Sequence, residues 1–89
     1  MLNKIFSVFD VKAEIYMNPF TAGSSGLAIR TFTDIANDTS HPIGQHPEDY
    51  TLFELGSWDP VTCEIKQHDA KIPLGSGNDY LNHNIQIPK

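Results

Sequence analysis

Residues 50–57 constrain the fold of this chain more than any other segment, because they carry apolar side chains on both faces of a predicted strand. Successive side chains of an extended chain point to opposite faces, so Leu52 lies on one face while Phe53 and Leu55 lie on the other. A strand that is apolar on both sides is typical of the centre of a sheet. One helix covers only one of these faces, so a second copy, the end of the chain or another protein must cover the rest.

The segments around this strand predict the order β-β-α-β-β. Residues 3–9 are rich in β-branched and aromatic side chains, which is typical of a strand. Residues 13–18 and 62–68 show the two-residue alternation that places successive side chains on opposite faces of a strand. Between the two predicted hairpins, residues 26–37 place apolar side chains on one helical stripe. This order predicts an α+β fold in which one helix packs on a face of a small antiparallel sheet.

Eighty-nine residues make one domain at most, and two polar stretches interrupt its predicted regular structure. Residues 38–49 contain two prolines and a glycine and predict a long loop. The sequence Gly75-Ser76-Gly77 predicts a flexible joint. We therefore expect a single domain over residues 1–75, followed by a flexible C-terminal tail over residues 76–89.

The charge balance restricts the ligands that this chain can bind. It carries eleven acidic and six basic residues, which gives a formal net charge of −5. Non-specific binding to DNA is driven by Lys and Arg side chains that neutralise phosphates, and no two of the six bases are adjacent in the sequence. The composition therefore disfavours a general DNA coat unless the folded chain gathers its cations.

The cysteine content and the apolar segments indicate where the protein acts. The single cysteine, Cys63, excludes an intramolecular disulfide and fits a protein of the reducing cytoplasm. The apolar stretch near the N-terminus is short and is interrupted by Ser7 and Asp10, so it predicts neither a signal peptide nor a membrane span. We therefore expect no contact with a membrane.

The run from His46 to Gly56, followed by Asp59 and Thr62, resembles a signature of the small nonstructural protein of gokushovirus-type microviruses, which are single-stranded-DNA bacteriophages. This run reads His-Pro-Glu-Asp-Tyr-Thr-Leu-Phe-Glu-Leu-Gly. Shorter matches stand in the same order elsewhere in the chain: Ile5–Asp10, Lys12–Glu14, Pro19-Phe20, Ala28–Asp34 and Pro73–Gly75. Together these pieces cover about three-quarters of the chain, and the central run is long enough to be specific.

The resemblance implies a phage gene product that is made in the host cytoplasm and is not built into the capsid. Members of this family are often described as taking part in single-stranded DNA synthesis or as DNA-binding. Relatives often carry Thr-Gly where this chain has Thr62-Cys63. Because cysteine does not take a positive φ as cheaply as glycine, we expect a different turn at this position.

Binding of single-stranded DNA requires cations and stacking aromatic rings on one surface. Six residues are the candidates for this surface: Lys12, Tyr16, Arg30, Trp58, Lys66 and Lys71. The first two belong to the first predicted hairpin, and Trp58 and Lys66 belong to the second. The alternative is that the two aromatic residues are half-buried in the sheet and the cations are ordinary solvated side chains, which the acidic balance favours.

Metal binding or nucleophilic catalysis requires titratable side chains that converge. A structural zinc site takes four ligands, for which His41, His46, His68 and Cys63 are the candidates, but the His-x4-His spacing of the first two, in a loop with two prolines, is a weak signal. His68 is the fifth residue after Cys63, so the two side chains fall on opposite faces of the predicted strand and the histidine cannot activate the thiol. We therefore expect no metal, no cofactor, no small-molecule substrate and no enzymatic activity.

The sequence thus predicts a non-enzymatic accessory phage protein that binds the viral single strand during genome replication or packaging, as a homo-oligomer. The alternative is a protein–protein interaction module that binds a host or phage factor and contacts no DNA. DNA binding predicts that Lys12, Arg30 and Lys66 share one basic surface and that affinity falls steeply with salt.

Overall fold

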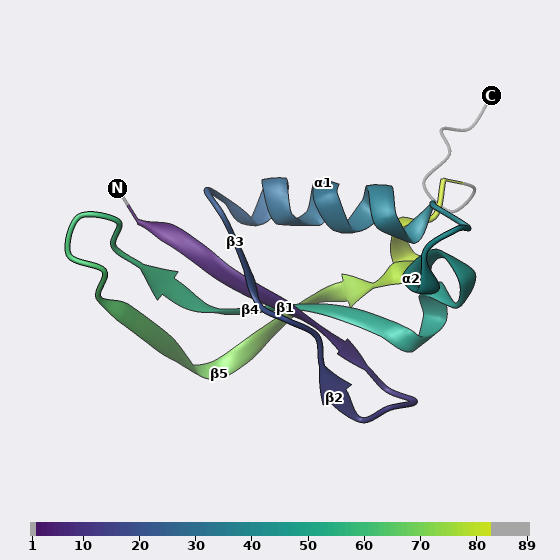
Figure 1. Ribbon diagram of the computed structural model, residues 1–89, viewed down its shortest axis with the longest axis horizontal. Coiled ribbons are helices and arrows are strands. Elements are labelled where there is room, and N and C mark those ends of the chain that lie inside the picture. The colour runs from purple at the N-terminus through teal and green to yellow at the C-terminus, as the bar shows by residue number, and fades with distance from the viewer. Residues whose placement is uncertain (1, 83–89) are drawn as a thin grey trace.

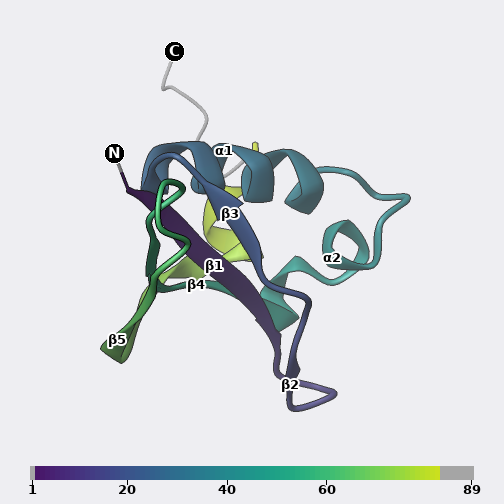
Figure 2. The same cartoon turned by 60° about the vertical axis from the view of Figure 1, so that its left-hand side comes forward.

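The computed structural model describes residues 2–82 and confirms the predicted α+β fold, with an antiparallel sheet and one main helix on its face. Its elements in chain order are β1 (Asn3–Asp10), β2 (Ile15–Tyr16), β3 (Phe20–Ala22), α1 (Ser25–Ala36), α2 (Pro42–Gln45), the 3-10 helix η1 (Pro47–Asp49), β4 (Tyr50–Trp58), β5 (Ile65–Ser76) and the 3-10 helix η2 (Gly77–Tyr80). Helix α1 lies across one side of the sheet, above β1 and β4 in Figure 1. The turned view in Figure 2 shows the same two layers.

All strand pairs are antiparallel, in the order β2-β1-β4-β5, and β3 pairs with β1 outside this path. Strand β4 therefore lies between two neighbours, as its two apolar faces predicted. Phe6 pairs with Glu54, so these two side chains point to the same face of the sheet. The register of β1 and β4 then shifts, so that Ile5 pairs with Gly56 and Leu55 forms a bulge.

The core lies between α1 and the side of the sheet that faces it. Its buried apolar side chains come from both layers and from α2: Phe6, Val8, Ala28, Phe32, Ala36, Ile43 and Leu52. Full burial of one of the larger of these side chains, such as Phe6, Phe32 or Leu52, stabilises the fold by about 1.5–3 kcal/mol. The helix begins at Ser25 because the side chain of Ser24 accepts a hydrogen bond from the backbone N–H of Leu27, at 3.2 Å.

The segment that was predicted as a loop, residues 38–49, contains two short helices instead. His41 begins α2 by accepting a hydrogen bond at Nδ1 from the backbone N–H of Ile43, at 3.1 Å. Gly44 lets α2 pack closely on the end of α1, because a Cβ atom there would lie 1.8 Å from the carbonyl oxygen of Asp38. Each helix is about one turn long, so neither has the repeating apolar pattern by which sequence reveals helices.

The first hairpin differs from its prediction in two ways. The strand expected over residues 13–18 holds only Ile15 and Tyr16, because residues 11–14 form the turn. Pro19 interrupts the pairing with β1, but the chain pairs with β1 again immediately afterwards as β3. The sequence did not predict this three-residue strand.

The second hairpin corrects two further predictions. Strand β5 begins at Ile65 rather than at residue 62, since residues 59–64 connect it to β4. Cys63 has a φ of 63°, so the expectation that it would avoid positive φ is wrong. The turn holds Cys63 in this conformation because its backbone N–H bonds to the carbonyl oxygen of Asp59, at 2.6 Å.

The chain between residues 76 and 82 belongs to the folded domain, so the predicted domain end at residue 75 is wrong for this segment. Tyr80 of η2 packs edge-on against Phe32 of α1, with 6.1 Å between the ring centroids. The side chain of Asn37, at the end of α1, donates a hydrogen bond to the carbonyl oxygen of Tyr80, at 3.0 Å. These contacts fix η2 against the helix.

The glycines that suggested a flexible joint are needed for close packing instead. A Cβ atom on Gly75, whose φ is 130°, would lie 2.8 Å from the ring of Tyr80. A Cβ atom on Gly77 would lie 2.7 Å from the carbonyl oxygen of Pro47. The rest of the predicted tail, residues 83–89, lies outside the described residues.

Candidate functional site: the open face of the sheet

The sheet has a second side that α1 does not cover. Alternation along β1 turns Phe6 and Val8 toward the helix and Phe9 away from it, and pairing places Tyr16 on the same side as Phe9. No helix lies over this side within residues 2–82 (Figures 1 and 2). We call it the open face, and its apolar and aromatic residues include Ile5, Phe9, Tyr16, Phe53, Leu55, Trp58 and Ile65.

Three aromatic rings meet on the open face and form what we call the aromatic platform: Phe9, Tyr16 and Phe53. The ring centroid of Tyr16 lies 4.8 Å from that of Phe9 and 5.8 Å from that of Phe53. Tyr16 is 41% exposed, so its ring remains accessible to a ligand. The Nζ atom of Lys71, from β5, lies 5.6 Å from the centroid of the Tyr16 ring. The open face therefore combines accessible aromatic surface with a positive charge.

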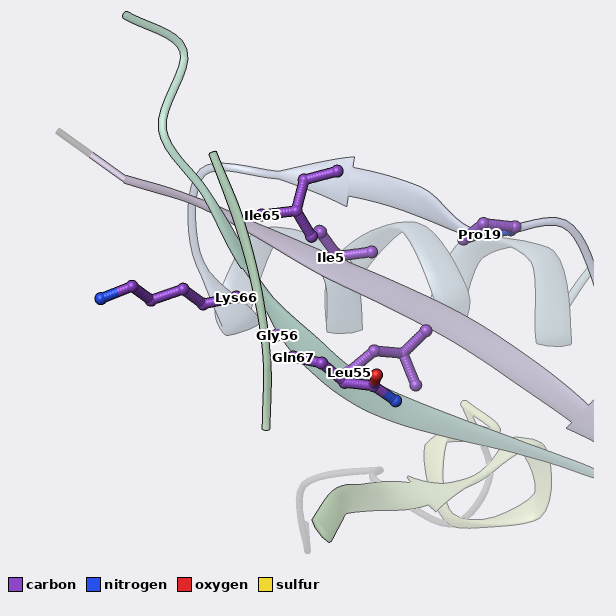
Figure 3. Close-up of a pocket in the computed structure, with 7 residues that line it drawn as sticks. All are labelled: Ile5, Pro19, Leu55, Gly56, Ile65, Lys66 and Gln67. Atoms are coloured by element: carbon purple, nitrogen blue, oxygen red, sulfur yellow. The ribbon is translucent and has the colours of Figure 1, made fainter. Parts of the chain in front are cut away.

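A hollow of about 200 Å³ lies on the same face, lined mainly by β1, β4 and β5. Its walls are aliphatic, and Figure 3 shows the side chains of Ile5, Ile65 and Leu55 gathered around it. The amide of Gln67 lies beside Leu55, whereas the ammonium group of Lys66 points away from these side chains (Figure 3). The hollow thus offers an apolar surface with one uncharged polar group.

On the side that faces the helix, Glu54 is a buried carboxylate with several polar partners. The hydroxyl of Ser25 donates to its Oε1 at 3.0 Å, the Nε2 atom of His68 lies 2.9 Å from its Oε2, and the Nζ atom of Lys4 lies 3.6 Å from its Oε1. Burial raises the pKa of Glu54, but the hydrogen bonds from His68 and Ser25 and the charge of Lys4 outweigh it and hold the pKa below its ordinary value. This cluster joins α1 to β1, β4 and β5.

Of the six residues that the sequence predicted for DNA binding, the structure brings Tyr16 and Lys71 together. Lys12 is exposed in the turn that leads into β2, the strand that carries Tyr16. Trp58 is half-buried at the end of β4, and its indole nitrogen has no hydrogen-bond partner among the described residues. The aromatic platform itself includes two rings, Phe9 and Phe53, that the sequence did not single out.

The two remaining predicted residues lie elsewhere. Arg30 is exposed on α1, whose buried residues face the sheet, so it lies on the opposite side of the molecule from the aromatic platform. Lys66 belongs to β5, and its ammonium group points away from the hollow (Figure 3). Lys12, Arg30 and Lys66 therefore do not gather on the open face, where Lys71 is the cation in contact with an aromatic ring.

The four side chains considered as zinc ligands, His41, His46, His68 and Cys63, have separate surroundings. The first caps α2, His68 contacts the buried carboxylate, and Cys63 is exposed in the β4–β5 turn. His46 lies near two acidic side chains of η1, with ligand atoms within 4.8 Å of one another. These three groups come from one largely exposed stretch of the chain, and such acidic groups are common where no metal binds.

The sequence model of the phage ORF5 protein family matches residues 3–80, from the start of β1 to the end of η2. No curated protein and no solved structure matches the chain. Among the helices of the described residues, none combines the length and the apolar character needed to cross a membrane.

Proposed function

The chain belongs to the phage ORF5 protein family, and on this basis we propose that it is a non-enzymatic accessory protein that binds single-stranded DNA through the open face. We assign it to the gokushovirus-type microviruses. It acts in the host cytoplasm during replication or packaging of the viral genome. The protein carries no cofactor in this role and has no small-molecule substrate.

The observation that carries the proposal is the position of Lys71 over the ring of Tyr16, beside two further aromatic rings. Proteins that bind single strands combine cations that contact phosphates with aromatic rings on which bases stack. Each stacked base contributes about 1–3 kcal/mol to the binding free energy. Stacking depends little on the DNA sequence, because every base has a π face. Lys71 provides the cation for a phosphate, and the exposed ring of Tyr16 provides the surface on which a base stacks.

The few cations on the open face change the expected salt dependence. Each phosphate of a single strand that the protein neutralises contributes about −0.7 to the slope of a plot of the logarithm of affinity against the logarithm of salt concentration. Lys71, together with Lys12 on the neighbouring turn, supports contacts with one or two phosphates. We therefore expect a shallow slope of about −1, in place of the steep dependence that one shared basic surface would produce.

A second candidate function is a protein–protein interaction module, which the apolar character of the open face favours. Ile65 is 65% exposed and Tyr16 is 41% exposed, and both belong to this face. A second copy of the chain or another phage or host protein would remove this apolar surface from water. We propose that the protein forms a homo-oligomer for the same reason.

Binding of a fluorescent single-stranded oligonucleotide, measured at a series of salt concentrations together with the oligomeric mass in the same buffers, separates the two functions. The proposal predicts binding at low salt with a shallow slope. A chain that self-associates but binds no oligonucleotide at low salt would contradict DNA binding and support the interaction module.

A further inference from the structure

We propose that the hollow on the open face binds one unstacked base of the single strand and that Gln67 contacts the edge of this base. The inference rests on the proposed function, because it takes the strand to lie along the open face. It goes beyond that function by assigning a preference for certain bases, which an aromatic platform alone does not provide.

The spacing along the strands places the hollow within reach of the same DNA strand. Leu55 follows Phe53 by two residues on β4, and Ile5 precedes Phe9 by four residues on β1. At a rise of about 3.3 Å per residue these separations are about 7 and 13 Å. A stacked strand advances about 3.4 Å per nucleotide, and an unstacked strand advances further. A base that lies a few nucleotides from the one stacked on Tyr16 therefore reaches the hollow.

The lining of the hollow offers both kinds of contact that a base makes, apolar contact to its faces and hydrogen bonding to its edge. The walls contributed by Ile5, Ile65 and Leu55 offer apolar contact to the faces of a ring. The amide of Gln67 offers both a donor and an acceptor, which are the groups that the edges of bases present. The side chain of Lys66 points away from the hollow, so its ammonium group does not contact a base bound there.

The backbone beneath the hollow holds Gln67 in place. Gln67 pairs with Gly56 in the ladder between β4 and β5. A Cβ atom on Gly56 would lie 2.1 Å from the carbonyl oxygen of Lys66, so the two strands approach each other closely at this point. This close approach fixes the position at which the Gln67 side chain leaves the backbone, while its amide stays free to turn toward the edge of a base.

The test compares the affinities of the wild type for oligonucleotides of dT, dA and dC of equal length. We expect a preference of about fivefold for one of them, as one well-placed base contact provides. Gln67→Ala should reduce this preference to less than about twofold while binding through the platform remains. Gln45→Ala is the matched control, because it removes an exposed amide from α2 and should keep the wild-type preference.

Three results would overturn the inference, and they differ in what they imply for the proposed function. Equal wild-type affinities for the three oligonucleotides, or a preference that survives in Gln67→Ala, would exclude base contact in the hollow and leave DNA binding by the platform intact. No binding of any oligonucleotide at low salt would overturn both. A Gln67→Ala protein whose oligomeric mass changes, with unchanged base preference, would assign the hollow to a protein contact.

Discussion

The Nε2 atom of His68 lies 2.9 Å from the Oε2 atom of Glu54, across a shift in the register between β4 and β5. On one side of the shift Gly56 pairs with Gln67, and on the other side Glu54 pairs with Ile72. Strand β5 therefore has several residues more than β4 between these two pairs. His68 ties the start of this longer segment back to the buried carboxylate, so the contact supports the path of β5 along the open face.

Glu54→Gln should weaken the dependence of stability on pH. The pKa of Glu54 in the folded chain lies below its ordinary value because hydrogen bonds from His68 and Ser25 outweigh the effect of burial. The ionised carboxylate therefore stabilises the fold above the ordinary pKa, and this contribution is lost as the pH falls through the folded pKa. Urea unfolding at about pH 7 and about pH 3 measures the loss.

The control for this experiment is Glu48→Gln, which removes an exposed carboxylate from η1. The wild type and Glu48→Gln should lose similar free energies of unfolding between the two pH values, and Glu54→Gln should lose less. If all three proteins lost the same amount, the buried carboxylate would not contribute to acid sensitivity.

Cys63→Gly should stabilise the protein by about 0.5–1 kcal/mol, because a side chain at positive φ brings its Cβ atom too close to the backbone. Cys63 has a φ of 63°. Cys63→Ala is the matched control, since it removes the thiol but keeps the Cβ atom, and it should bring no such gain. Urea unfolding of the three proteins measures the effect. A glycine variant no more stable than the alanine variant would show that the turn does not strain residue 63.

Tyr80→Ala should destabilise the protein by about 2 kcal/mol. Its ring packs against Phe32, and its hydroxyl donates a hydrogen bond to the carbonyl oxygen of Leu74, so the substitution removes both. Leu27→Ala is the control, because this side chain is 53% exposed and its truncation should change stability by less than about 0.5 kcal/mol. Equal effects in chemical unfolding would mean that η2 does not unfold together with the domain.

Asp69→Asn should tighten the binding of single-stranded DNA about twofold, because it removes an exposed negative charge from the strand that carries Lys71. Asp69 lies two residues before Lys71 on β5, on the same side of that strand. Asp34→Asn makes the same change in net charge on the exposed side of α1. Fluorescence anisotropy at one salt concentration compares the two. Similar gains from both variants would show that net charge, rather than the open face, governs binding.

The parts of the fold that the sequence predicted are those that local periodicity determines. Leu52 and Phe53 on opposite faces placed β4 at the centre of the sheet, and the stripe containing Ala28 and Phe32 placed the helix against it. Helix α2 was not predicted because a helix of one turn is too short to show a repeating pattern of apolar residues. Gly75 was misread because its role depends on the ring of Tyr80, which only the folded chain brings to it.

The candidate site was predicted less completely, because it depends on register. Tyr16 and Lys71 were both candidates, but they are far apart in the sequence. Phe9 pairs with Tyr16, and the pairing of β1 with β4 brings Phe53 beside them. The register shift in β5 then carries Lys71 over the ring of Tyr16. Alternation reveals which face a side chain occupies, but it does not reveal which residues of neighbouring strands stand opposite each other.

The most direct test of DNA binding by the open face compares Lys71→Ala with Arg30→Ala. Both variants remove one positive charge from an exposed position, but Lys71 contacts the aromatic platform and Arg30 lies on the opposite side of the molecule. The affinity of each protein for the same single-stranded oligonucleotide is measured at low salt. We predict that Lys71→Ala binds several-fold more weakly than the wild type and that Arg30→Ala binds as the wild type does. Equal losses in the two variants, or no binding by the wild type, would contradict the account.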